Sequence, residues 1–266
     1  MQRYQIHSFQ VQEAGHNKIL VLIAGSENYK AILQRAFPTY KFSRSFEARS
    51  GRFDWGTYVY DIPPAVQQRI KDFLEVLTVA ICIEDDLTEC FALDFHSEIG
   101  PAGPRRTVMG QLVYEAKPYR PGTGSTTKAD ELAGLMSVFI QGHPTYAAAD
   151  VLIAVPPSNP NKPFDLPTYL VQRLASLLGK PNATDWVRKV RATRPMKDCV
   201  TPQEKLDNVR GAFAITAAAD FAGKSVIMID DIYQSGFTIN EVSHVVAESG
   251  ANRMLGLAAT KTFAEV

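Results

Sequence analysis

The sequence predicts an α/β protein built on a doubly wound parallel sheet, preceded by an N-terminal α+β appendage. The 266 residues are 45% hydrophobic and 21% charged, which is typical of a folded globular protein. Residues 150–155 and 226–229 form nearly continuous apolar runs, as expected of strands covered on both faces. Helical and strand patterns alternate after residue 106, and helices between parallel strands give right-handed crossovers.

The first hundred residues mix strand and helix patterns. Residues 19–25 predict a buried strand, and Ser26 is the predicted N-cap of a helix that runs through Phe37. Residues 52–60 are rich in aromatic and β-branched side chains and predict another strand. Two prolines at 63 and 64 open a predicted helix whose apolar positions follow the helical period: Val66, Ile70, Phe73, Leu74 and Leu77.

A domain boundary is predicted near residue 106. Residues 78–83 and 89–95 predict a hairpin, and the glycines and prolines of residues 100–106 then break the pattern. We therefore expect residues 1–106 to form an α+β domain of unknown role and residues 107–266 to form the sheet domain.

The predicted elements of the second domain alternate as a doubly wound fold requires. Thr201 and Glu204 make a capping box with Pro202 at the first helical position, and Gly179 ends the preceding helix. In chain order the expected elements are an extended segment at 111–117, a helix near 129–140, a strand at 150–155, a helix ending at 179, a helix at 202–209, strands at 213–215 and 225–229, a helix at 239–249 and a strand at 253–259.

A candidate ligand site follows the apolar strand at residues 225–229. Asp230 and Asp231 come directly after it, and ligands of open α/β sheets bind at the carboxyl ends of the strands. A helix N-terminus with free amides favours phosphate, and carboxylates accept hydrogen bonds from sugar hydroxyls. We expect Asp230 and Asp231 to hold a ribose edge, and the phosphate to be held by Tyr233, Gln234, Ser235, Gly236, Phe237 and Thr238. The alternative is an acidic pair that ends a strand and a turn that caps a helix.

These residues resemble the phosphoribosyl diphosphate (PRPP) signature of type I phosphoribosyltransferases. The match covers residues 226–238: an apolar strand, two acidic residues, three variable positions, Ser, Gly, one variable position and Thr. Residues 187–195 and 205–213 resemble the ComF family of competence-associated phosphoribosyltransferase-like proteins. This resemblance covers about residues 111–260. It implies a sheet of the type I phosphoribosyltransferase kind, PRPP binding, and magnesium (Mg2+) held through the ligand and water.

The resemblance also assigns residues outside the signature. It puts the diphosphate loop at residues 155–162, with Ser158 and Lys162, and a mobile basic flap at residues 188–205, with Arg191 and Arg194. Arg210 is a further candidate for ligand contact. The alternatives are a solvated basic loop and an Arg210 that pairs with Asp207.

Two functions of different classes follow from these features. In the first, a phosphoribosyltransferase of the glycosyltransferase class passes the phosphoribosyl group of PRPP to a nitrogenous acceptor with loss of diphosphate, and Asp230 and Asp231 are catalytic. In the second, a non-catalytic module senses PRPP or a nucleotide, while the N-terminal domain binds DNA or a protein in a competence-like or defence-like process. Prolines at 156 and 157, where the family carries a more basic stretch, favour the second, and the family's N-terminal zinc-binding cysteines are absent.

Composition limits the partners. The 28 basic and 28 acidic residues cancel, so global attraction to nucleic acid or to an anionic membrane is not favoured. Cys82, Cys90 and Cys199 have no metal-ligand spacing and fit a reducing compartment. No signal-peptide pattern or bilayer-length apolar run is visible, so we expect a cytoplasmic protein with no membrane partner. A homodimer is a further expectation.

Overall fold

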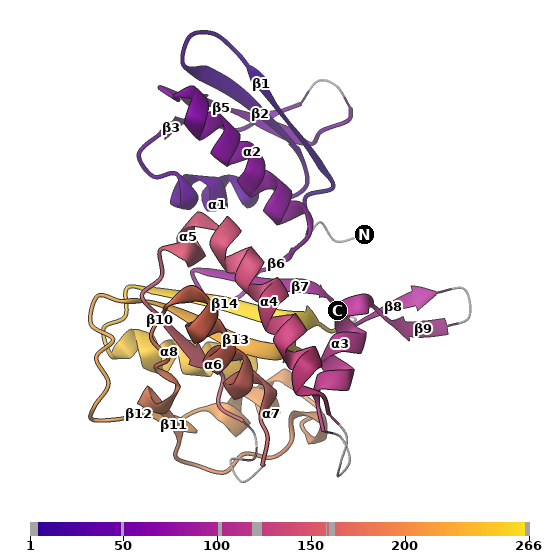
Figure 1. Ribbon diagram of the computed structural model, residues 1–266, viewed down its shortest axis with the longest axis vertical. Helices are drawn as coiled ribbons and strands as arrows, with labels where there is room; N and C mark the ends of the chain where they lie inside the picture. Colours follow the sequence, from indigo (N-terminus) through magenta and orange to yellow (C-terminus); the bar gives the residue numbers. More distant parts are fainter. Residues whose placement is uncertain are drawn as a thin grey trace. The chain divides into compact units, whose positions relative to one another are not determined.

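The chain folds into two compact units (Figure 1). The computed structural model describes residues 5–48, 51–100, 103–118, 124–157, 159 and 163–263, apart from the side chain of Lys197. Unit 1 comprises Met1–Cys82 and Phe139–Ala147, and unit 2 comprises Ile83–Val138 and Ala148–Val266. The chain leaves the first unit at Cys82, not at Arg106 as the sequence suggested, because strand β7 (Glu89–Phe95) belongs to the parallel sheet of unit 2.

Unit 1 contains an antiparallel sheet with helices α1 and α2, and it also includes α5 (Pro144–Ala147) and the end of α4. Its strand order is β1-β2-β5-β3, and β4 also pairs with β5. The predicted N-cap is wrong: Asn28 precedes the first helix, and the Ser26 hydroxyl only accepts a bond from the Asn28 amide. The elements are β1 (Ser8–Glu13), β2 (Lys18–Ala24), α1 (Tyr29–Ala36), β3 (Lys41–Phe42), β4 (Phe46–Glu47), β5 (Trp55–Tyr60) and α2 (Pro64–Thr78).

The sheet of unit 2 has the strand order β10-β13-β14-β7-β6. The pairs β10–β13, β13–β14 and β14–β7 are all parallel. The predicted hairpin partners β6 and β7 are neighbours at one end of this order. The remaining bounds are β6 (Ile81–Ile83), β10 (Val151–Ala154), β13 (Ser225–Tyr233) and β14 (Arg253–Lys261).

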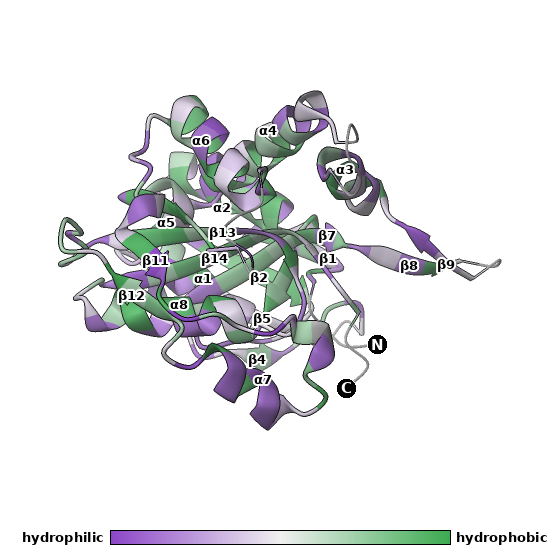
Figure 2. Cartoon of the chain, turned by 90° about the horizontal axis from the view of Figure 1, so that it is seen from below, coloured by the Kyte–Doolittle hydropathy of each residue, from purple (hydrophilic) through white to green (hydrophobic). Residues whose placement is uncertain are grey.

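Helices cover both faces of this sheet, so the predicted doubly wound α/β fold is confirmed. In Figure 2, α3 (Val108–Ala116) and α6 (Leu166–Leu178) lie on one face and α8 (Phe237–Glu248) lies on the other. Gly179 adopts the left-handed conformation after α6, as its position predicted. The other helices are α4 (Thr126–Gly142), α5 (Pro144–Ala147), α7 (Pro202–Val209) and the 3-10 turns Thr184–Trp186 and Met196–Asp198.

One segment that was expected to be extended is a helix. Residues 108–116 form α3, whose N-cap Thr107 accepts a hydrogen bond from the Gly110 amide at 3.0 Å. Leu112, Val113 and Ala116 are buried along one side of it. Their spacing of one and three residues is that of an amphipathic helix, and the cap fixes where the helix begins.

Two other segments differ from the expected arrangement. Strand β12 (Phe213–Ile215) forms as predicted, but it pairs antiparallel with β11 (Val187–Lys189) outside the main sheet. The segment that was expected to break the pattern near residue 103 forms a hairpin of β8 (Ser97–Gly100) and β9 (Gly103–Arg106).

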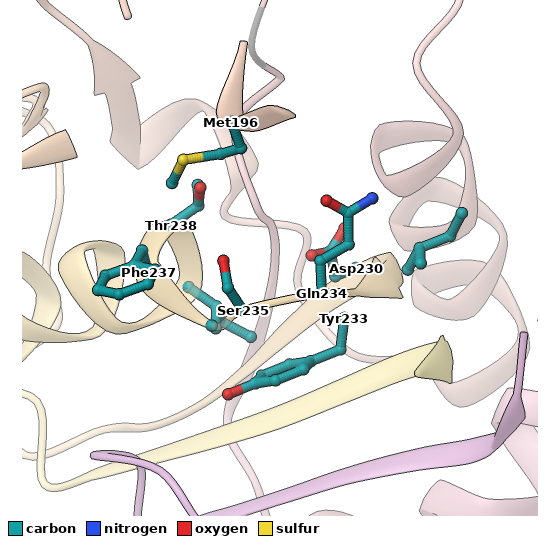
Figure 3. A pocket seen from close by; sticks show the side chains of 10 residues that line it. Met196, Asp230, Tyr233, Gln234, Ser235, Phe237 and Thr238 are labelled. Atoms are coloured by element: carbon teal, nitrogen blue, oxygen red, sulfur yellow. The ribbon is translucent and has the colours of Figure 1, made fainter. Parts of the chain in front are cut away.

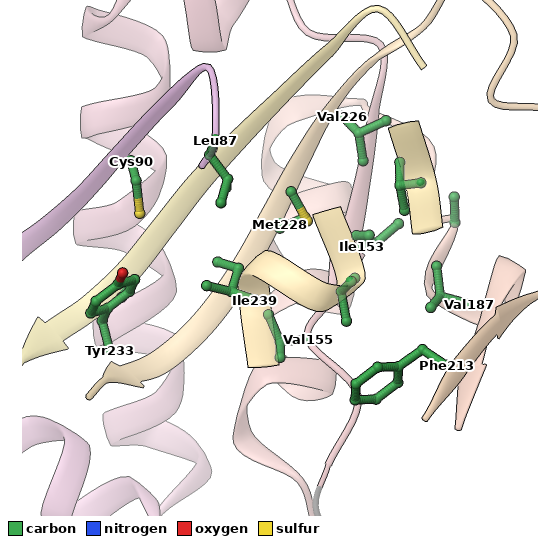
Figure 4. Packing of buried hydrophobic residues seen from close by; sticks show 14 of the residues in the cluster. Leu87, Cys90, Ile153, Val155, Val187, Phe213, Val226, Met228, Tyr233 and Ile239 are labelled. Carbon is green, nitrogen blue, oxygen red and sulfur yellow. The ribbon is translucent and has the colours of Figure 1, made fainter. Parts of the chain in front are cut away.

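The core of unit 2 joins the sheet to α8. Figure 4 shows Met228 of β13 and Ile153 of β10 packed near Ile239 at the start of α8. These side chains are at most 2% exposed. Each buried side chain of this size contributes about 1.5–3 kcal/mol, so the end of β13 and the start of α8 are held together by apolar packing.

Candidate functional site

The acidic pair lies inside β13, near its carboxyl end. The strand continues to Tyr233, four residues beyond the predicted end at Ile229, and Asp230 pairs with Ala258 of β14. The β13–α8 turn (residues 234–236) follows, and α8 begins at Phe237. The strand and the helix therefore deliver the acidic pair and the turn to one edge of the sheet.

A pocket at this edge brings together most of the signature residues (Figure 3). In Figure 3 the Ser235 and Thr238 side chains lie on the side of the β13–α8 turn that faces Met196. Asp231, Arg191, Arg194 and Arg210 are not among the described residues that line it. The lining residues are Met196, Asp230, Ile232, Tyr233, Gln234, Ser235, Gly236, Phe237, Thr238 and Ile239.

The N-terminus of α8 opens into the pocket. The amide of Asn240 donates to the Gly236 carbonyl at 2.9 Å, so the amides of the three preceding residues belong to the first turn, where a helix offers them no carbonyl. No side chain caps this helix, although Ser235 and Thr238 are in the positions that suggested a cap. Amides and the helix dipole together favour an anion here.

Tyr233 packs against the β13–α8 turn from the core side. Its side chain is 6% exposed, and its hydroxyl donates to an Asp85 carboxylate oxygen at 3.2 Å. Gly236 adopts a φ of 74°, and a Cβ atom at this position would overlap the Tyr233 hydroxyl. The buried Tyr233 ring therefore covers the edge of the sheet, and its hydroxyl is bonded to Asp85.

The two aspartates have different surroundings. Burial, and next the charge of Asp231, raise the pKa of Asp230 to about 7, although the Asp231 amide donates to Asp230 at 2.8 Å. Asp231 instead makes an ion pair with Lys117, with 2.7 Å between Nζ and Oδ2. The Asp231 side chain is 13% exposed and that of Lys117 is 23% exposed. One carboxylate is thus neutralised by an ammonium, whereas burial favours the protonated form of the other.

The predicted basic flap is tied to α7 by hydrogen bonds. The Arg191 guanidinium donates to the carbonyls of Asp207, Asn208 and Arg210, at the C-terminal end of that helix. The side chain of Asn208 accepts from the Arg194 amide at 2.8 Å and donates to the Arg194 carbonyl at 2.9 Å. Arg191 therefore stabilises the C-terminal end of α7. Asn208 fixes the backbone of Arg194, two residues before Met196.

The remaining predicted residues have separate outcomes. Arg210 forms an exposed pair with Asp207 at 3.8 Å, the alternative that the sequence left open. Ser158 and Lys162 lie outside the described residues. The loop that contains them begins at Pro156, immediately after Val155, whose amide donates to the Ile229 carbonyl at 2.9 Å.

Sequence reasoning missed three residues at this site. Met196 lies in the predicted flap but carries no charge that would single it out, and Asp85 lies in a turn that reads as a hairpin connection. Lys117 is the last residue of the segment that was expected to be extended, 111–117, so its proximity to Asp231 had no local signal.

The described part of the chain contains no metal cluster and no membrane span. Among the residues that the structure describes, no three His, Cys, Asp or Glu side chains gather as a metal site. No helix in the described ranges is both long and apolar enough to cross a bilayer.

No protein-family model matches the chain, and no curated protein matches its sequence. Similar solved structures include a phosphoribosylpyrophosphate synthetase from Mycobacterium smegmatis, with 22% identity and a TM-score of 0.32 over 49% of this chain and 33% of that one. A glutamine PRPP amidotransferase from B. subtilis, in complex with ADP and GMP, has 14% identity and a TM-score of 0.38 over 91% of this chain and 46% of its own. This chain therefore spans less than half the length of either structure.

A third similar structure is shorter. Adenine phosphoribosyltransferase from Saccharomyces cerevisiae has 14% identity and a TM-score of 0.39 over 72% of this chain and 89% of its own.

Proposed function

We propose that unit 2 binds PRPP, or a related ribose 5-phosphate ester, in the pocket between the end of β13 and the start of α8. The observation that carries the proposal is the grouping of a carboxylate, Asp230, with the hydroxyls of Ser235 and Thr238 and the amides of a helix N-terminus. The resemblance of residues 226–238 to a PRPP signature supports the same ligand.

The ligand would lie with its 5-phosphate on the first turn of α8. Amide donors and the Ser235 and Thr238 hydroxyls match the acceptor oxygens of a phosphate monoester. The ribose hydroxyls would then face Asp230 and Asp231, which accept hydrogen bonds when ionised. Gly236 allows the backbone to pass close to the phosphate, because its φ of 74° is one that glycine adopts without strain.

The reaction that fits this arrangement is phosphoribosyl transfer to a nitrogenous acceptor. The anomeric carbon gains positive charge as diphosphate leaves, and carboxylates at the ribose edge stabilise that charge. Magnesium carried with the diphosphate would neutralise the negative charge of this leaving group. The acidic pair provides few ligands for magnesium, because Asp231 is already paired with Lys117. The ion would be held through the ligand and water.

Calorimetry with ribose 5-phosphate and ribose tests the binding claim. We expect ribose 5-phosphate to bind and ribose to bind far more weakly, because the phosphate contacts dominate. Thr238→Ala should weaken the binding of ribose 5-phosphate and of PRPP alike by about 10-fold or more, since a hydrogen bond to a charged group contributes about 1.5–3 kcal/mol. Ser249→Ala, which removes a hydroxyl after the other end of α8, is the matched control. Equal affinities for ribose and ribose 5-phosphate would overturn the proposal.

A second candidate function is a non-catalytic PRPP or nucleotide sensor that acts with a DNA or protein partner. Pro156 and Pro157 favour it, because prolines have no amide N–H to donate to a diphosphate at the end of β10. Diphosphate release across a panel of bases and amines separates the two functions. Turnover with any acceptor supports the transferase, whereas PRPP binding without turnover supports the sensor.

A further inference from the structure

We propose that the ammonium of Lys117 takes the place of a metal ion beside the acidic pair. It neutralises Asp231, so that a ribose 5-phosphate binds without a metal ion at Asp230 and Asp231. The inference deepens the proposed function, on which its ligand rests, and concerns the metal requirement of the same pocket. It starts from the ion pair between Lys117 Nζ and Asp231 Oδ2 at 2.7 Å.

This ion pair is better shielded from water than the surface pairs of the chain. Asp231 is 13% exposed, whereas Asp220 is 70% exposed in its pair with Lys224, which has the same 2.7 Å separation. Solvent and salt screen an exposed pair, so its contribution is small, but they act less on a buried one. The ammonium of Lys117 is therefore an effective counter-charge for Asp231.

The backbone of Lys117 is held in place by the anchoring of α3. The Thr107 hydroxyl donates to the Phe95 carbonyl at 2.5 Å and accepts from the Gly110 amide, which fixes the start of the helix against the end of β7. A Cβ at Gly110 would overlap the His96 carbonyl, so the helix lies very close to the chain there. At the other end, the amide of Lys117 donates to the Val113 carbonyl at 3.2 Å.

The acidic pair is a poor donor set for a divalent cation in this arrangement. Asp231 already binds the ammonium of Lys117, and Asp230 Oδ1 accepts the amide of Asp231 at 2.8 Å. Magnesium requires near-octahedral oxygen coordination and charged ligands. The geometry leaves it few protein oxygens and an adjacent positive charge.

The other charges that face the pair do not replace Lys117. Asp165 acts on Asp230 and adds negative charge. His96, whose Nδ1 lies 3.1 Å from the Thr260 hydroxyl, has its pKa lowered by burial and then by Arg106 and Lys117, so it is neutral near pH 7. Among the residues that the structure describes, Lys117 thus supplies a positive charge in direct contact with Asp231.

Replacing Lys117 should expose the acidic pair to cations. In Lys117→Met the Asp231 carboxylate loses its ammonium, so its uncompensated charge repels a phosphorylated ligand and attracts a divalent ion. Lys224→Met is the matched control, because it breaks an ion pair of the same length at an exposed site. Adding Asp231→Asn to Lys117→Met should remove the new cation site, because the pair then keeps a single carboxylate.

The experiment has two arms. The first titrates Mn2+, followed by electron paramagnetic resonance, into the ligand-free full chain and its variants. We expect no site at the pair in the wild type and in Lys224→Met, and one new site in Lys117→Met that the added Asp231→Asn removes. The second measures ribose 5-phosphate affinity by calorimetry in EDTA and in Mg2+. We expect affinities within about 3-fold in the wild type, and an approximately 10-fold loss in EDTA for Lys117→Met that Mg2+ reverses, or about 1.4 kcal/mol.

The two arms separate this inference from the proposed function. Mn2+ binding that is the same in the wild type and in Lys117→Met overturns the role of Lys117, whatever the ligand does. An absolute Mg2+ requirement for ribose 5-phosphate in the wild type overturns it as well. Failure of every form to bind ribose 5-phosphate in either buffer rejects the proposed function, and the Mn2+ arm still decides the role of Lys117.

Discussion

Gly236 and Tyr233 show how a single contact sets the shape of the β13–α8 turn. The turn needs a left-handed residue, and the Tyr233 hydroxyl occupies the space that a Cβ at Gly236 would fill. The hydroxyl is held in turn by Asp85 at 3.2 Å. The turn is therefore supported from the core side as well as by its own backbone conformation.

Gly236→Ala should abolish binding of ribose 5-phosphate or weaken it by more than 10-fold. The added methyl meets the Tyr233 hydroxyl, and the left-handed conformation itself costs about 1 kcal/mol. Gly179→Ala is the control, because Gly179 has a φ of 64° and a Cβ added there would meet nothing within 4 Å. Calorimetry on both variants separates backbone strain from the clash. An unchanged affinity in Gly236→Ala would show that the turn does not shape the phosphate site.

The raised pKa of Asp230 predicts that this residue costs stability at neutral pH. The folded state binds its proton up to about pH 7, whereas the unfolded state releases it near the ordinary aspartate pKa of 3.8. The folded state is thus progressively destabilised as the pH rises from about 4 to 7. Asp230→Asn should increase the free energy of unfolding at pH 8 by on the order of 1–3 kcal/mol and leave it nearly unchanged at pH 4.

Thermal unfolding of the wild type and Asp230→Asn across this pH range measures the effect. Asp220→Asn is a suitable control, since Asp220 is exposed and its pKa is lowered, chiefly by its hydrogen bond with Lys224. A gain from Asp230→Asn that is the same at pH 4 and pH 8 would contradict the assignment of the raised pKa.

At the scale of the elements, the segment between β11 and α7 is ordered by two polar side chains. Asn208 is 8% exposed and clamps both backbone groups of Arg194, while Arg191 bonds carbonyls at the end of α7. These contacts position Met196 at the pocket. A flap that moves on ligand binding would have to move with α7 or release Asn208.

Asn208→Ala should free the segment next to the pocket. The Arg194 amide loses its acceptor, so its hydrogen exchange should accelerate by about 10-fold, which corresponds to a net hydrogen bond of roughly 1 kcal/mol or somewhat more. Gln203→Ala is the control, because Gln203 makes an exposed bond to Asp207 on the same helix. Exchange of the Arg194 amide that matches the wild type would contradict the clamp.

Elements with local signals could be predicted from the sequence, and elements fixed by distant partners could not. Two local signals are confirmed: the capping box at Thr201 and Glu204 and the glycine at 179. They could be predicted because each depends on residues only a few positions away. Helix α3 was missed because its pattern of apolar positions is short enough to read as a strand. Strand β12 was recognised, but its pairing with β11 depends on residues more than 20 positions away.

The site divides in the same way. The pocket-forming run from Asp230 to Thr238 is nearly contiguous, so a single stretch of sequence indicated it. Lys117 is more than 100 residues from Asp231, and only the fold brings the two together. Arg191 shows the converse: its charge suggested a ligand, whereas the structure gives it backbone carbonyls.

At the scale of the whole molecule, unit 2 contains every described residue of the candidate site, and unit 1 has a separate antiparallel sheet. The role of unit 1 stays a proposal, as does its DNA or protein partner. The division at Cys82 could not be read from composition, because β7 joins the parallel sheet through pairing with β14, near the C-terminal end of the chain.

The most direct test of the account is a nuclear magnetic resonance titration of the full chain with ribose 5-phosphate. If the pocket binds the phosphate, the amides of residues 235–239 should shift in a saturable manner, and ribose should produce no comparable change. Amides of unit 1 should stay unperturbed. Saturable shifts confined to residues outside unit 2, or none in residues 235–239 at a ligand concentration that saturates calorimetric binding, would contradict it.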